Sequence, residues 1–543
     1  ERSLNRRAIR GNGVGFEDVP VHAEYIERIE SAGAKVRVVS RLLNAVSVDA
    51  GEETLRQIEQ LPFVRGIAPV GTYTREYPID GDLPIPSRGD YGTSLQQNYQ
   101  LRTDMAHRLG LSGDGVLISI HDTGFKLDHE SLIHSEVLGA YDFVDDDSIV
   151  SFEPGDPSMS ESHGTMVWSI ISGYYPGQLI GTGFGASVLL ARTEHYTMED
   201  PIEEDFWIAA AEWADSAGAD IISTSLGYYE WYSPDSMTGD IAPISIAARL
   251  LTERGICCVI CAGNNGSYGP TSITAPGDAH DVITVGAVDY YGNRLGFSSR
   301  GPTADGRIKP EVSAMGSGVK CAGHYGTTDF RTGSGTSASA PLISGLVALM
   351  LEARPELNPL EIRSALIATS SRATSPNNEV GWGVPDAISA LAYPAGGRTA
   401  IAVFAGWNFV SLPLADVVPV DVAFPRRVGD VFYWDADLME YVEATAIEPA
   451  HGYFVFYTSD TLLLVDGAPL DSYEISVSAG WHAIGGAARL NTIEDVASRS
   501  SVNFHSHFYV FNTDIQNYVS TKTLQPGKAA FVLVTGEGTI RLE

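Results

Sequence analysis

The sequence predicts a multi-domain protein in which a large α/β domain lies between a small α+β domain and an all-β region. Three observations lead to this prediction: the length of 543 residues, the alternation of apolar runs with helical patterns between residues 110 and 394, and the short alternating strands after residue 394. At about 100–200 residues per domain, the length allows two to four domains. With 44% hydrophobic and 19% charged residues, the chain is expected to fold rather than remain disordered.

The charge distribution marks a boundary near residue 78. The formal net charge is −33, from 68 acidic and 35 basic residues. Residues 1–78 carry 11 of each, so the whole acidic excess lies after them. The stretch from Pro78 to Asp90 is rich in Pro, Gly and Asp, which indicates a linker. The acidic balance argues against nucleic-acid binding, and the absence of a run of 18 apolar residues argues against a transmembrane segment.

Residues 1–78 have the pattern of a compact α+β domain. Apolar residues at helical spacing, stopped by Gly33, indicate a first helix. Helices are expected at 21–32 and 52–60, and strands at 36–38, 45–48 and 63–69. The result is a small sheet with helices on one side, a pattern that by itself suits any small binding module.

Residues 395–543 contain an internal repeat. The sequence Ala-Gly-Trp that ends at Trp407 recurs at Trp481, and further matches follow at a slightly larger offset. Two tandem β-modules, 395–470 and 471–543, are therefore expected. Because the two tryptophans hold equivalent positions in the repeat, we interpret them as core anchors, with sugar-binding platforms as the alternative.

Three of the four cysteines lie in one apolar run. Cys258 and Cys261 have the Cys-x-x-Cys spacing of some metal sites, but no second pair follows. In a strand, Cys257 and Cys261 would point to one face and Cys258 to the other. Buried free thiols are the favoured interpretation.

Three polar residues begin or end apolar elements of the central domain. Asp122 follows the apolar run 116–120, at the end of a strand where α/β sheets gather ligands. His163 begins an apolar helical stretch, and Ser337 begins another that contains Pro341. Each alone has an ordinary structural explanation, as a turn or a helix cap.

Together, the three residues predict nucleophilic catalysis. A serine hydroxyl is a weak nucleophile at neutral pH, so His163 would take the proton from Ser337. Asp122 would hold the imidazole in the required tautomer and stabilise its charged form. The order Asp, His, Ser is that of subtilisin, whereas an α/β-hydrolase would show Gly-x-Ser-x-Gly around its serine. Here the residue two after Ser337 is Ser339.

A fourth polar residue follows another apolar strand. Asn264 comes directly after the cysteine-rich run and can aim its side-chain amide at a substrate carbonyl oxygen. Such a donor stabilises the oxyanion that forms during acyl transfer. The sequence Asn-Asn-Gly is also common in turns.

The segment from Gln97 to Leu391 resembles a subtilisin-like serine protease domain of the subtilase family. The resemblance depends on six short motifs in a specific order and spacing: Ile118–Gly124, His163–Met166, Ser225–Gly227, Ala262–Asn264, Phe297–Pro302 and Gly335–Pro341. It implies a catalytic triad of Asp122, His163 and Ser337, with Asn264 as oxyanion donor. It also implies that the primary specificity pocket is lined by Ser225, Leu226, Gly227, Ala262 and Gly263.

The resemblance gives each region an expected role. Residues 1–78 are similar to the family's inhibitory propeptide, for which a ferredoxin-like fold is implied. The linker 79–96 would contain the processing site, and 97–394 would be the protease domain with a mostly parallel sheet. Polypeptides would be the substrates, and the propeptide an intramolecular inhibitor.

The remaining expectations concern cofactors, location and an alternative function. No cofactor is expected for catalysis. The acidic stretch 142–156 suits a structural calcium ion, although a solvated loop is favoured because it lacks a calcium-loop spacing. We expect a monomer that is secreted or held at the cell surface and has already lost its signal segment. The alternative function is that of a catalytically silent relative serving as a binding or surface protein.

Overall fold

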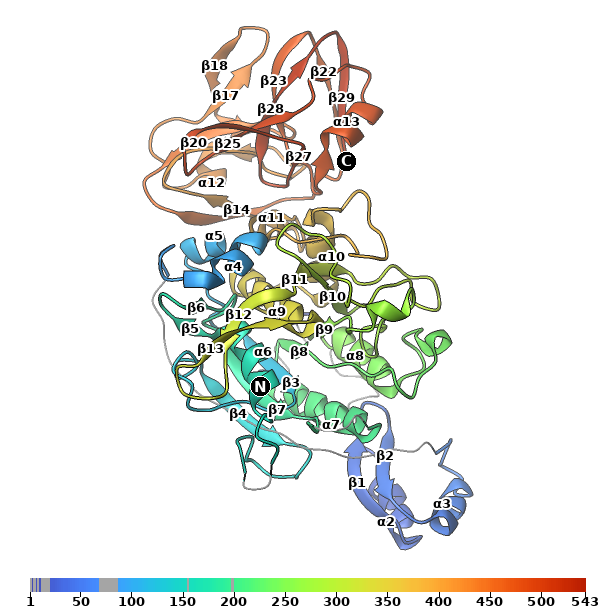
Figure 1. Cartoon of the computed structure of the whole chain (residues 1–543). Coiled ribbons are helices and arrows are strands. Elements are labelled where there is room, and N and C mark those ends of the chain that lie inside the picture. Colours follow the sequence, from blue (N-terminus) through green and yellow to red (C-terminus); the bar gives the residue numbers. More distant parts are fainter. Residues whose placement is uncertain are drawn as a thin grey trace.

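The structure is a computed structural model of the chain, and it describes residues 2, 6, 9–10, 20–67, 86–153, 156–196 and 200–543. Its parts follow one another along one axis (Figure 1). The small N-terminal domain lies at one end, the α/β domain in the middle and the β-rich C-terminal region at the other end.

The central domain is built on a seven-stranded parallel sheet. Its order is β11-β10-β9-β8-β3-β7-β4, and every pairing is parallel. The strands are β3 (Leu117–Asp122), β4 (Val137–Asp142), β7 (Ser187–Arg192), β8 (Ile221–Thr224), β9 (Cys257–Cys261), β10 (Ile283–Val288) and β11 (Val312–Met315). Because all seven run the same way, their carboxyl ends meet at one edge, which we call the carboxyl edge. The opposite edge is the amino edge. The predicted α/β class is confirmed.

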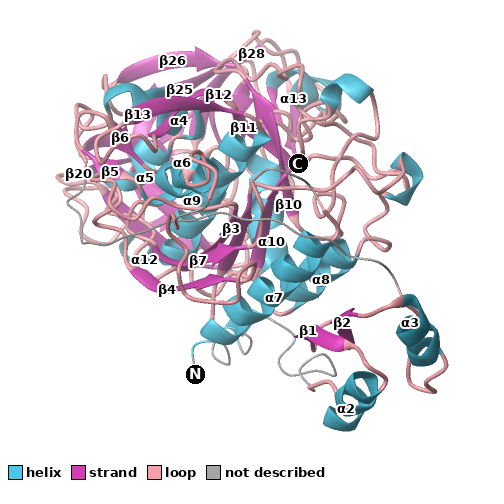
Figure 2. Cartoon of the chain, turned by 60° about the horizontal axis from the view of Figure 1, so that its bottom comes forward, coloured by secondary structure: helices cyan, strands magenta, loops and turns pink. Residues whose placement is uncertain are grey.

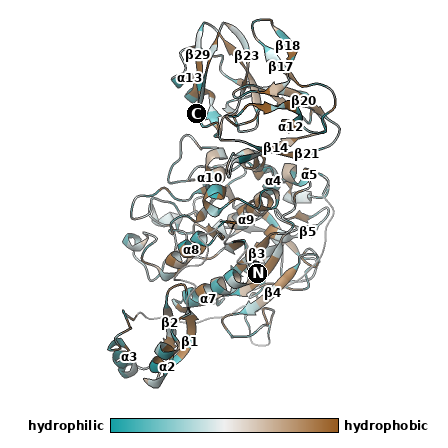
Figure 3. Ribbon diagram, turned by 180° about the vertical axis from the view of Figure 1, so that it is seen from behind, coloured by the Kyte–Doolittle hydropathy of each residue, from teal (hydrophilic) through white to brown (hydrophobic). Residues whose placement is uncertain are grey.

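Helices cover both faces of this sheet (Figure 2). One core lies between the sheet and helices α6 (Ser162–Ser172) and α9 (Thr336–Ala353). A second core lies between the other face and helices α7 (Ile202–Ala217) and α8 (Pro243–Glu253). Figure 3 shows hydrophobic residues gathered on the central strands.

Helix α9 is apolar along its length because it is buried in the middle of the central domain. Among the described residues, it is the one helix long and apolar enough to cross a membrane, and 89% of that stretch is buried inside the protein. It contacts four strands of the sheet as well as α6. We therefore describe it as the core helix of the domain.

Smaller elements complete the central domain. They are η2 (Gly92–Ser94), α4 (Leu95–Leu101), α5 (Thr103–Arg108), β5 (Tyr174–Tyr175), β6 (Leu179–Ile180), η3 (Pro234–Ser236), η4 (Gly266–Tyr268), β12 (Ser317–Ala322), β13 (Phe330–Ser334), α10 (Pro359–Thr369) and α11 (Ala387–Ala392). Strands β12 and β13 pair as a hairpin that leads directly into α9.

The described N-terminal domain follows the order α2 (Ala23–Ser31), β1 (Lys35–Ser40), β2 (Ala45–Asp49) and α3 (Glu52–Glu59). These four elements match the predicted helices and the first two strands, and β1 pairs with β2 in antiparallel fashion. The strand expected at 63–69 was wrong in its described part, because residues 63–67 form turn and coil. A ferredoxin-like sheet stays a prediction, since residues 11–19 and 68–85 lie outside the described residues.

The C-terminal region consists of antiparallel strands and two short helices. Its first part holds β14 (Arg398–Val403), β15 (Gly406–Val410), β16 (Val418–Pro419), α12 (Val420–Ala423), β17 (Phe432–Asp435), β18 (Glu440–Glu443), β19 (Ala446–Ile447), β20 (Tyr453–Tyr457) and β21 (Thr461–Asp466). Its second part holds β22 (Tyr473–Val477), β23 (Gly480–Gly485), β24 (Asn491–Thr492), α13 (Ile493–Arg499), β25 (Phe508–Asn512), β26 (Asn517–Thr521), β27 (Thr523–Leu524), β28 (Ala529–Val534) and β29 (Gly538–Leu542). Ala400 and Ala402 of β14, and Phe404 directly after it, belong to the hydrophobic core of the central domain, which anchors this region to it.

The interpretation of Trp407 and Trp481 as core anchors is wrong. Their exposed fractions are 38% and 41%. In β15 the next residue, Asn408, points inward instead, and its side chain bonds to the backbone of Phe404. Each tryptophan meets the edge of a neighbouring ring on the surface of its sheet.

Candidate active site

Asp122 is the last residue of β3, at the carboxyl edge of the sheet. The side chain is fully buried, and three donors converge on its Oδ1 atom. The backbone N–H of Thr123 lies 2.7 Å away, the Thr123 hydroxyl 2.6 Å away and Nδ1 of His163 2.8 Å away. These bonds fix the carboxylate in one orientation, facing the start of α6.

His163 is the second residue of α6, and its side chain is 27% exposed. The approach of this helix to β3 depends on Gly164. A Cβ atom at Gly164 would lie 2.7 Å from the ring of Phe125 and 2.8 Å from the carbonyl oxygen of Gly124. Only glycine therefore lets α6 come close enough for His163 to reach Asp122, a role that the sequence analysis missed.

A second histidine, His121, adjoins Asp122 but points away from this site. It is fully buried, contacts Ser119 and packs edge-on against Trp207. Burial lowers its pKa to about 3, so the ring is neutral and is not a base near neutral pH.

Ser337 lies in the first turn of α9, where it is nearly buried. The residue before this turn, Gly335, has a φ of +129°, which disfavours a side chain. A Cβ atom there would lie 2.9 Å from the Ser337 hydroxyl and 3.6 Å from the amide nitrogen of Asn264. Glycine thus keeps open the space between Ser337 and Asn264.

Asn264 follows β9 and reaches across to the start of α9. Its Oδ1 accepts hydrogen bonds from the backbone N–H of Thr336 at 3.0 Å and from the Thr336 hydroxyl at 3.2 Å. A backbone N–H can only donate, so the oxygen must face Thr336 and the NH₂ group must face the other way. The amide is held with its donor directed away from the helix.

The structure thus brings the four predicted residues to one edge of the sheet in two bonded groups. One group is Asp122 with His163, and the other is Asn264 with the first turn of α9. In the part of the chain that the structure describes, no hydrogen bond joins His163 to Ser337. Catalytic bonds of this kind are often long before substrate binds.

Of the predicted pocket residues, Ser225 follows β8 and donates its hydroxyl to the carbonyl oxygen of Ser337 at 3.0 Å. Leu226 accepts a weak hydrogen bond from the Cys261 thiol through its carbonyl oxygen. Gly227 and Gly263 both face the side chain of Thr274, as described below. Ala262 is fully buried, and its carbonyl oxygen accepts from the N–H of Thr274.

Comparison with known proteins assigns the family. Residues 113–383 match the model of the subtilase family, and residues 1–78 match that of the peptidase S8 propeptide domain of Bacteroidota. The chain belongs to the subtilase family. The predicted family and its propeptide are both confirmed.

Relatives align with about half of the length of this subtilase. Subtilisin DY of Bacillus licheniformis is 29% identical over 274 residues, which cover 50% of this chain and 89% of that protein. The membrane-bound transcription factor site-1 protease of Mus musculus is 28% identical over 303 residues, 53% of this chain but only 26% of its own length. The chain thus spans about a quarter of the length of this mammalian relative. A solved protease of Pseudoalteromonas arctica aligns at 24% identity with a TM-score of 0.46, covering 57% of this chain and 99% of that one.

All four cysteines of this subtilase are free and buried, which confirms the prediction made for Cys257, Cys258 and Cys261. Cys257 and Cys261 belong to one core and Cys258 to the other, which follows from the alternation of side chains along β9. Burial raises the pKa of these three thiols to about 12. They are structural side chains, neither a metal site nor nucleophiles.

The acidic stretch after β4 surrounds an arginine. Asp142 pairs with Arg192 of β7, and Arg192 also lies 3.2 Å from Asp145 and 4.0 Å from Asp156. The guanidinium group supplies the positive charge that these carboxylates need. Among the described residues, no group of three or more His, Cys, Asp or Glu side chains is arranged to hold a metal ion.

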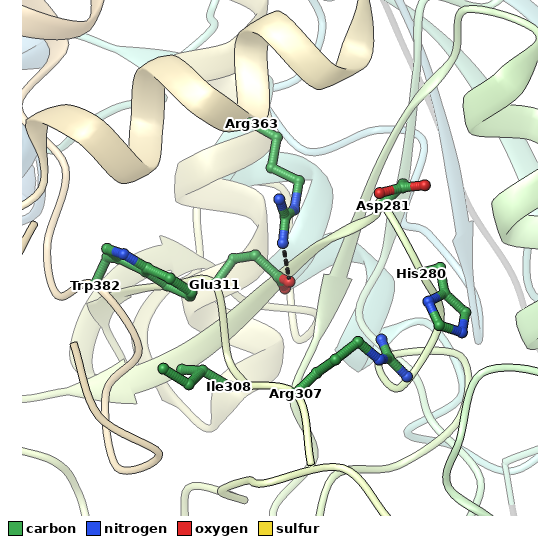
Figure 4. A pocket seen from close by; sticks show the side chains of 7 residues that line it. All are labelled: His280, Asp281, Arg307, Ile308, Glu311, Arg363 and Trp382. Atoms are coloured by element: carbon green, nitrogen blue, oxygen red, sulfur yellow. Dashed lines mark hydrogen bonds and ion pairs between the residues drawn. The ribbon is translucent and has the colours of Figure 1, made fainter. Parts of the chain in front are cut away.

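A cavity of about 280 Å³ lies at the amino edge of β10 and β11 (Figure 4). Glu311 in its lining is already paired: it lies 2.9 Å from Arg363, also in the lining, and 2.9 Å from the buried Lys309 behind it. Burial lowers the pKa of Lys309 to about 8, although Glu311 opposes the shift. We assign this cavity no catalytic role.

Proposed function

We propose that this subtilase is a serine endopeptidase that cleaves polypeptides through an acyl-enzyme. The observation that carries the proposal is the 2.8 Å hydrogen bond between Nδ1 of His163 and the buried Asp122. With Nδ1 donating to the carboxylate, Nε2 of the same ring is the atom that accepts a proton. The imidazole is therefore held in the tautomer that a general base requires.

The reaction follows from these positions. His163 takes the proton from Ser337 as Oγ attacks the carbonyl carbon of the peptide bond. The carbon–nitrogen bond then breaks, His163 gives the proton to the leaving amine, and the acyl group stays on Ser337. Water, deprotonated by the same imidazole, releases the acid and restores the serine.

The negative charge on the carbonyl oxygen is stabilised by two donors. One is the NH₂ group of Asn264, which the two bonds from Thr336 orient in advance. The other is the backbone N–H of Ser337, since the first amides of a helix have no acceptor within the helix. Donors fixed before the reaction need not reorganise as the charge develops.

We propose that residues 1–78 act as an intramolecular inhibitor, and their contacts with the protease domain support this role. The turn between β1 and β2 docks on α7. Leu42 is buried in the core beneath α7 and α8. The Glu212 carboxylate of α7 accepts from the hydroxyl of Ser40 at 2.5 Å and from the backbone N–H groups of Arg41 and Leu42.

A second contact comes from arginines before this domain. Arg6 is 1% exposed in its side chain and pairs with the fully buried Asp215 at the end of α7. Arg2 and Arg10 pair with Asp220 at 2.6 Å and 2.8 Å. The three guanidinium groups also donate to backbone carbonyl oxygens, those of Gly115, Gly218, Ala219, Arg254 and Pro355. We call this contact the arginine clamp, and it holds the inhibitor to the amino edge of the sheet.

The finer organisation of the chain is part of the proposal. The linker 79–96 would be cut during maturation; its residues up to 85 lie outside the described part of the chain. The modules 395–470 and 471–543 would be two copies of one fold. Their four-stranded sheets, β15-β20-β17-β18 and β23-β28-β25-β26, have the same order relative to the chain, which supports this.

Location and assembly complete the proposal. A propeptide-inhibited protease acts after export, so we place this protein outside the cell or at its surface. It would work as a monomer without a cofactor. A structural calcium ion would need a site other than the carboxylates around Arg192, which already have a cation.

Self-processing tests the proposed function against the catalytically silent alternative. The full chain and its Ser337→Ala variant are purified in parallel, and their masses are followed over time. We expect the unmodified chain to cleave itself near residue 78 into two fragments and the variant to remain uncleaved. If both remain whole and neither hydrolyses a casein substrate, the chain is a silent binding protein.

A further inference from the structure

The space between two glycines beside the active site is already filled. Gly227 follows β8 and Gly263 follows β9, and both belong to the segments that line the specificity pocket in the proposed function. A Cβ atom at Gly227 would lie 2.2 Å from Oγ1 of Thr274, and one at Gly263 would lie 2.5 Å from Cγ2 of the same residue. The Thr274 side chain therefore stands directly between the two segments.

Thr274 is held there by the backbone on both sides. Its N–H donates to the carbonyl oxygen of Ala262 at 3.1 Å, and its hydroxyl lies 3.4 Å from the same oxygen. The next residue, Ala275, exchanges two hydrogen bonds with Tyr228, at 2.8 Å and 3.0 Å. Thr274 is 2% exposed, so the surrounding atoms leave its side chain little room to swing aside.

We propose that Thr274 closes the specificity pocket and restricts the substrate residue before the cleaved bond to Gly, Ala or Ser. This inference rests on the proposed protease function and names its substrate class. A longer side chain would have to displace a threonine that is packed between two backbone segments. Overfilling such a site by even one methylene costs a factor of about 10–200 in kcat/KM.

A series of peptides that differ only at the residue before the cleaved bond tests the proposal. The full chain, after processing itself, is compared with three variants: Thr274→Gly, Thr274→Ala and Thr274→Val. We expect the unmodified enzyme to favour Ala over Leu and Phe by at least about tenfold in kcat/KM. Thr274→Gly should admit Leu and Phe, with at least a tenfold gain relative to Ala, and Thr274→Ala should show a smaller gain.

Thr274→Val is the matched control, because valine has the shape of threonine without the hydroxyl. It should keep the preference for small residues, which would show that volume and not hydrogen bonding decides it. The inference is overturned if the unmodified enzyme cleaves after Leu or Phe as well as after Ala, or if Thr274→Gly leaves the profile unchanged.

The failure of this inference can be told apart from failure of the proposed function. A serine-directed phosphonate reports the reactive serine whatever the peptide sequence. If the phosphonate labels the enzyme and peptides are cut with a broad profile, only the role of Thr274 is wrong. If the phosphonate does not label it and no peptide is cut, the protease function fails and the inference with it.

Discussion

The two edges of the central sheet differ in how their polar groups are held. At the carboxyl edge, Asp122, His163 and Asn264 are fixed by short hydrogen bonds to their neighbours, and glycines leave the space around them open. At the amino edge, ion pairs dominate: Arg6 with Asp215, and Lys309 with Glu311, all buried. At one edge hydrogen bonds orient the polar groups, and at the other edge buried charges neutralise one another.

The two edges also differ in which part of the chain supplies the groups that bond to their polar side chains. At the carboxyl edge, the hydrogen bonds that orient Asp122, His163 and Asn264 all come from the protease domain itself. At the amino edge, Asp215 lies at the C-terminal end of α7, where the helix dipole disfavours a negative charge. Its charge is neutralised in part by residues outside the protease domain. Arg6 and Arg41 from the propeptide lie against it, together with Arg254 of the protease domain. The proposed catalytic residues and the arginine clamp thus lie at opposite edges of one sheet.

The largest effect is expected from the oxyanion donor at the carboxyl edge. Asn264→Ala should lower kcat by about 10²–10³ with little change in KM, because the amide acts on charge that develops only in the transition state. Steady-state kinetics on a peptide substrate measures this. Thr336→Val should cost less, because the backbone N–H of Thr336 still orients the amide. Equal losses in kcat and affinity for Asn264→Ala would contradict its role.

A somewhat smaller effect is expected from the glycine that positions His163. In Gly164→Ala, the new methyl group meets Phe125 and the Gly124 carbonyl oxygen, so α6 must move. A displacement of about 1 Å can cost about 10² in rate. Gly326→Ala is the control, since no atom lies within 4 Å of a Cβ at that glycine. If both variants keep full kcat, α6 does not depend on Gly164.

At the amino edge, Arg6→Met should loosen the propeptide. In the Ser337→Ala background, which keeps the chain whole, we expect residues 20–67 to be cut by an added protease about tenfold faster than with Arg6 intact, since removing one partner of a buried pair is costly. Quantitative gels measure the rate. Arg56→Met provides the control, because the carboxylates of α3 with which Arg56 pairs are exposed. If residues 20–67 of Arg6→Met are cut no faster than with Arg6 intact, the arginine clamp does not hold the propeptide.

The smallest effect is expected when a thiol reagent is added to the folded protein, because its cysteines are buried. A thiol reagent needs thiolate, and burial raises the pKa of Cys257, Cys258 and Cys261 to about 12 and that of Cys321 to about 11. At pH 8 the folded protein should therefore show almost no reaction with Ellman's reagent, whereas the denatured chain should release four equivalents. Rapid labelling of the folded protein would show that these thiols are accessible.

Much of the site follows from local sequence. Asp122 ends the apolar strand β3 and Asn264 follows the end of β9, while His163 and Ser337 lie at the start of apolar helices, so parallel packing brings them to one edge. The alternation of Cys257 and Cys258 between two cores also follows from strand geometry. These inferences need only the period of each element and the rule that parallel strands end together.

The contacts between distant segments could not be predicted in this way. The pairing of Arg6 with Asp215 spans more than 200 residues, and nothing near either residue signals the other. Thr336 and Asn264 are 72 residues apart, and neither their surroundings nor those of Thr274 and Gly227 predict that the two residues of each pair meet. The prediction for Trp407 is wrong because a residue that recurs in both modules can lie in the core or on the surface of each module.

The most direct test of the central claim is to identify the residue that a serine-directed fluorophosphonate modifies. The processed enzyme is labelled, digested and examined by mass spectrometry, with His163→Ala as a second sample. We expect one adduct, on Ser337, and at least a hundredfold slower labelling in the variant, because His163 must take the serine's proton. An adduct on another serine, or equal labelling without His163, would contradict the account.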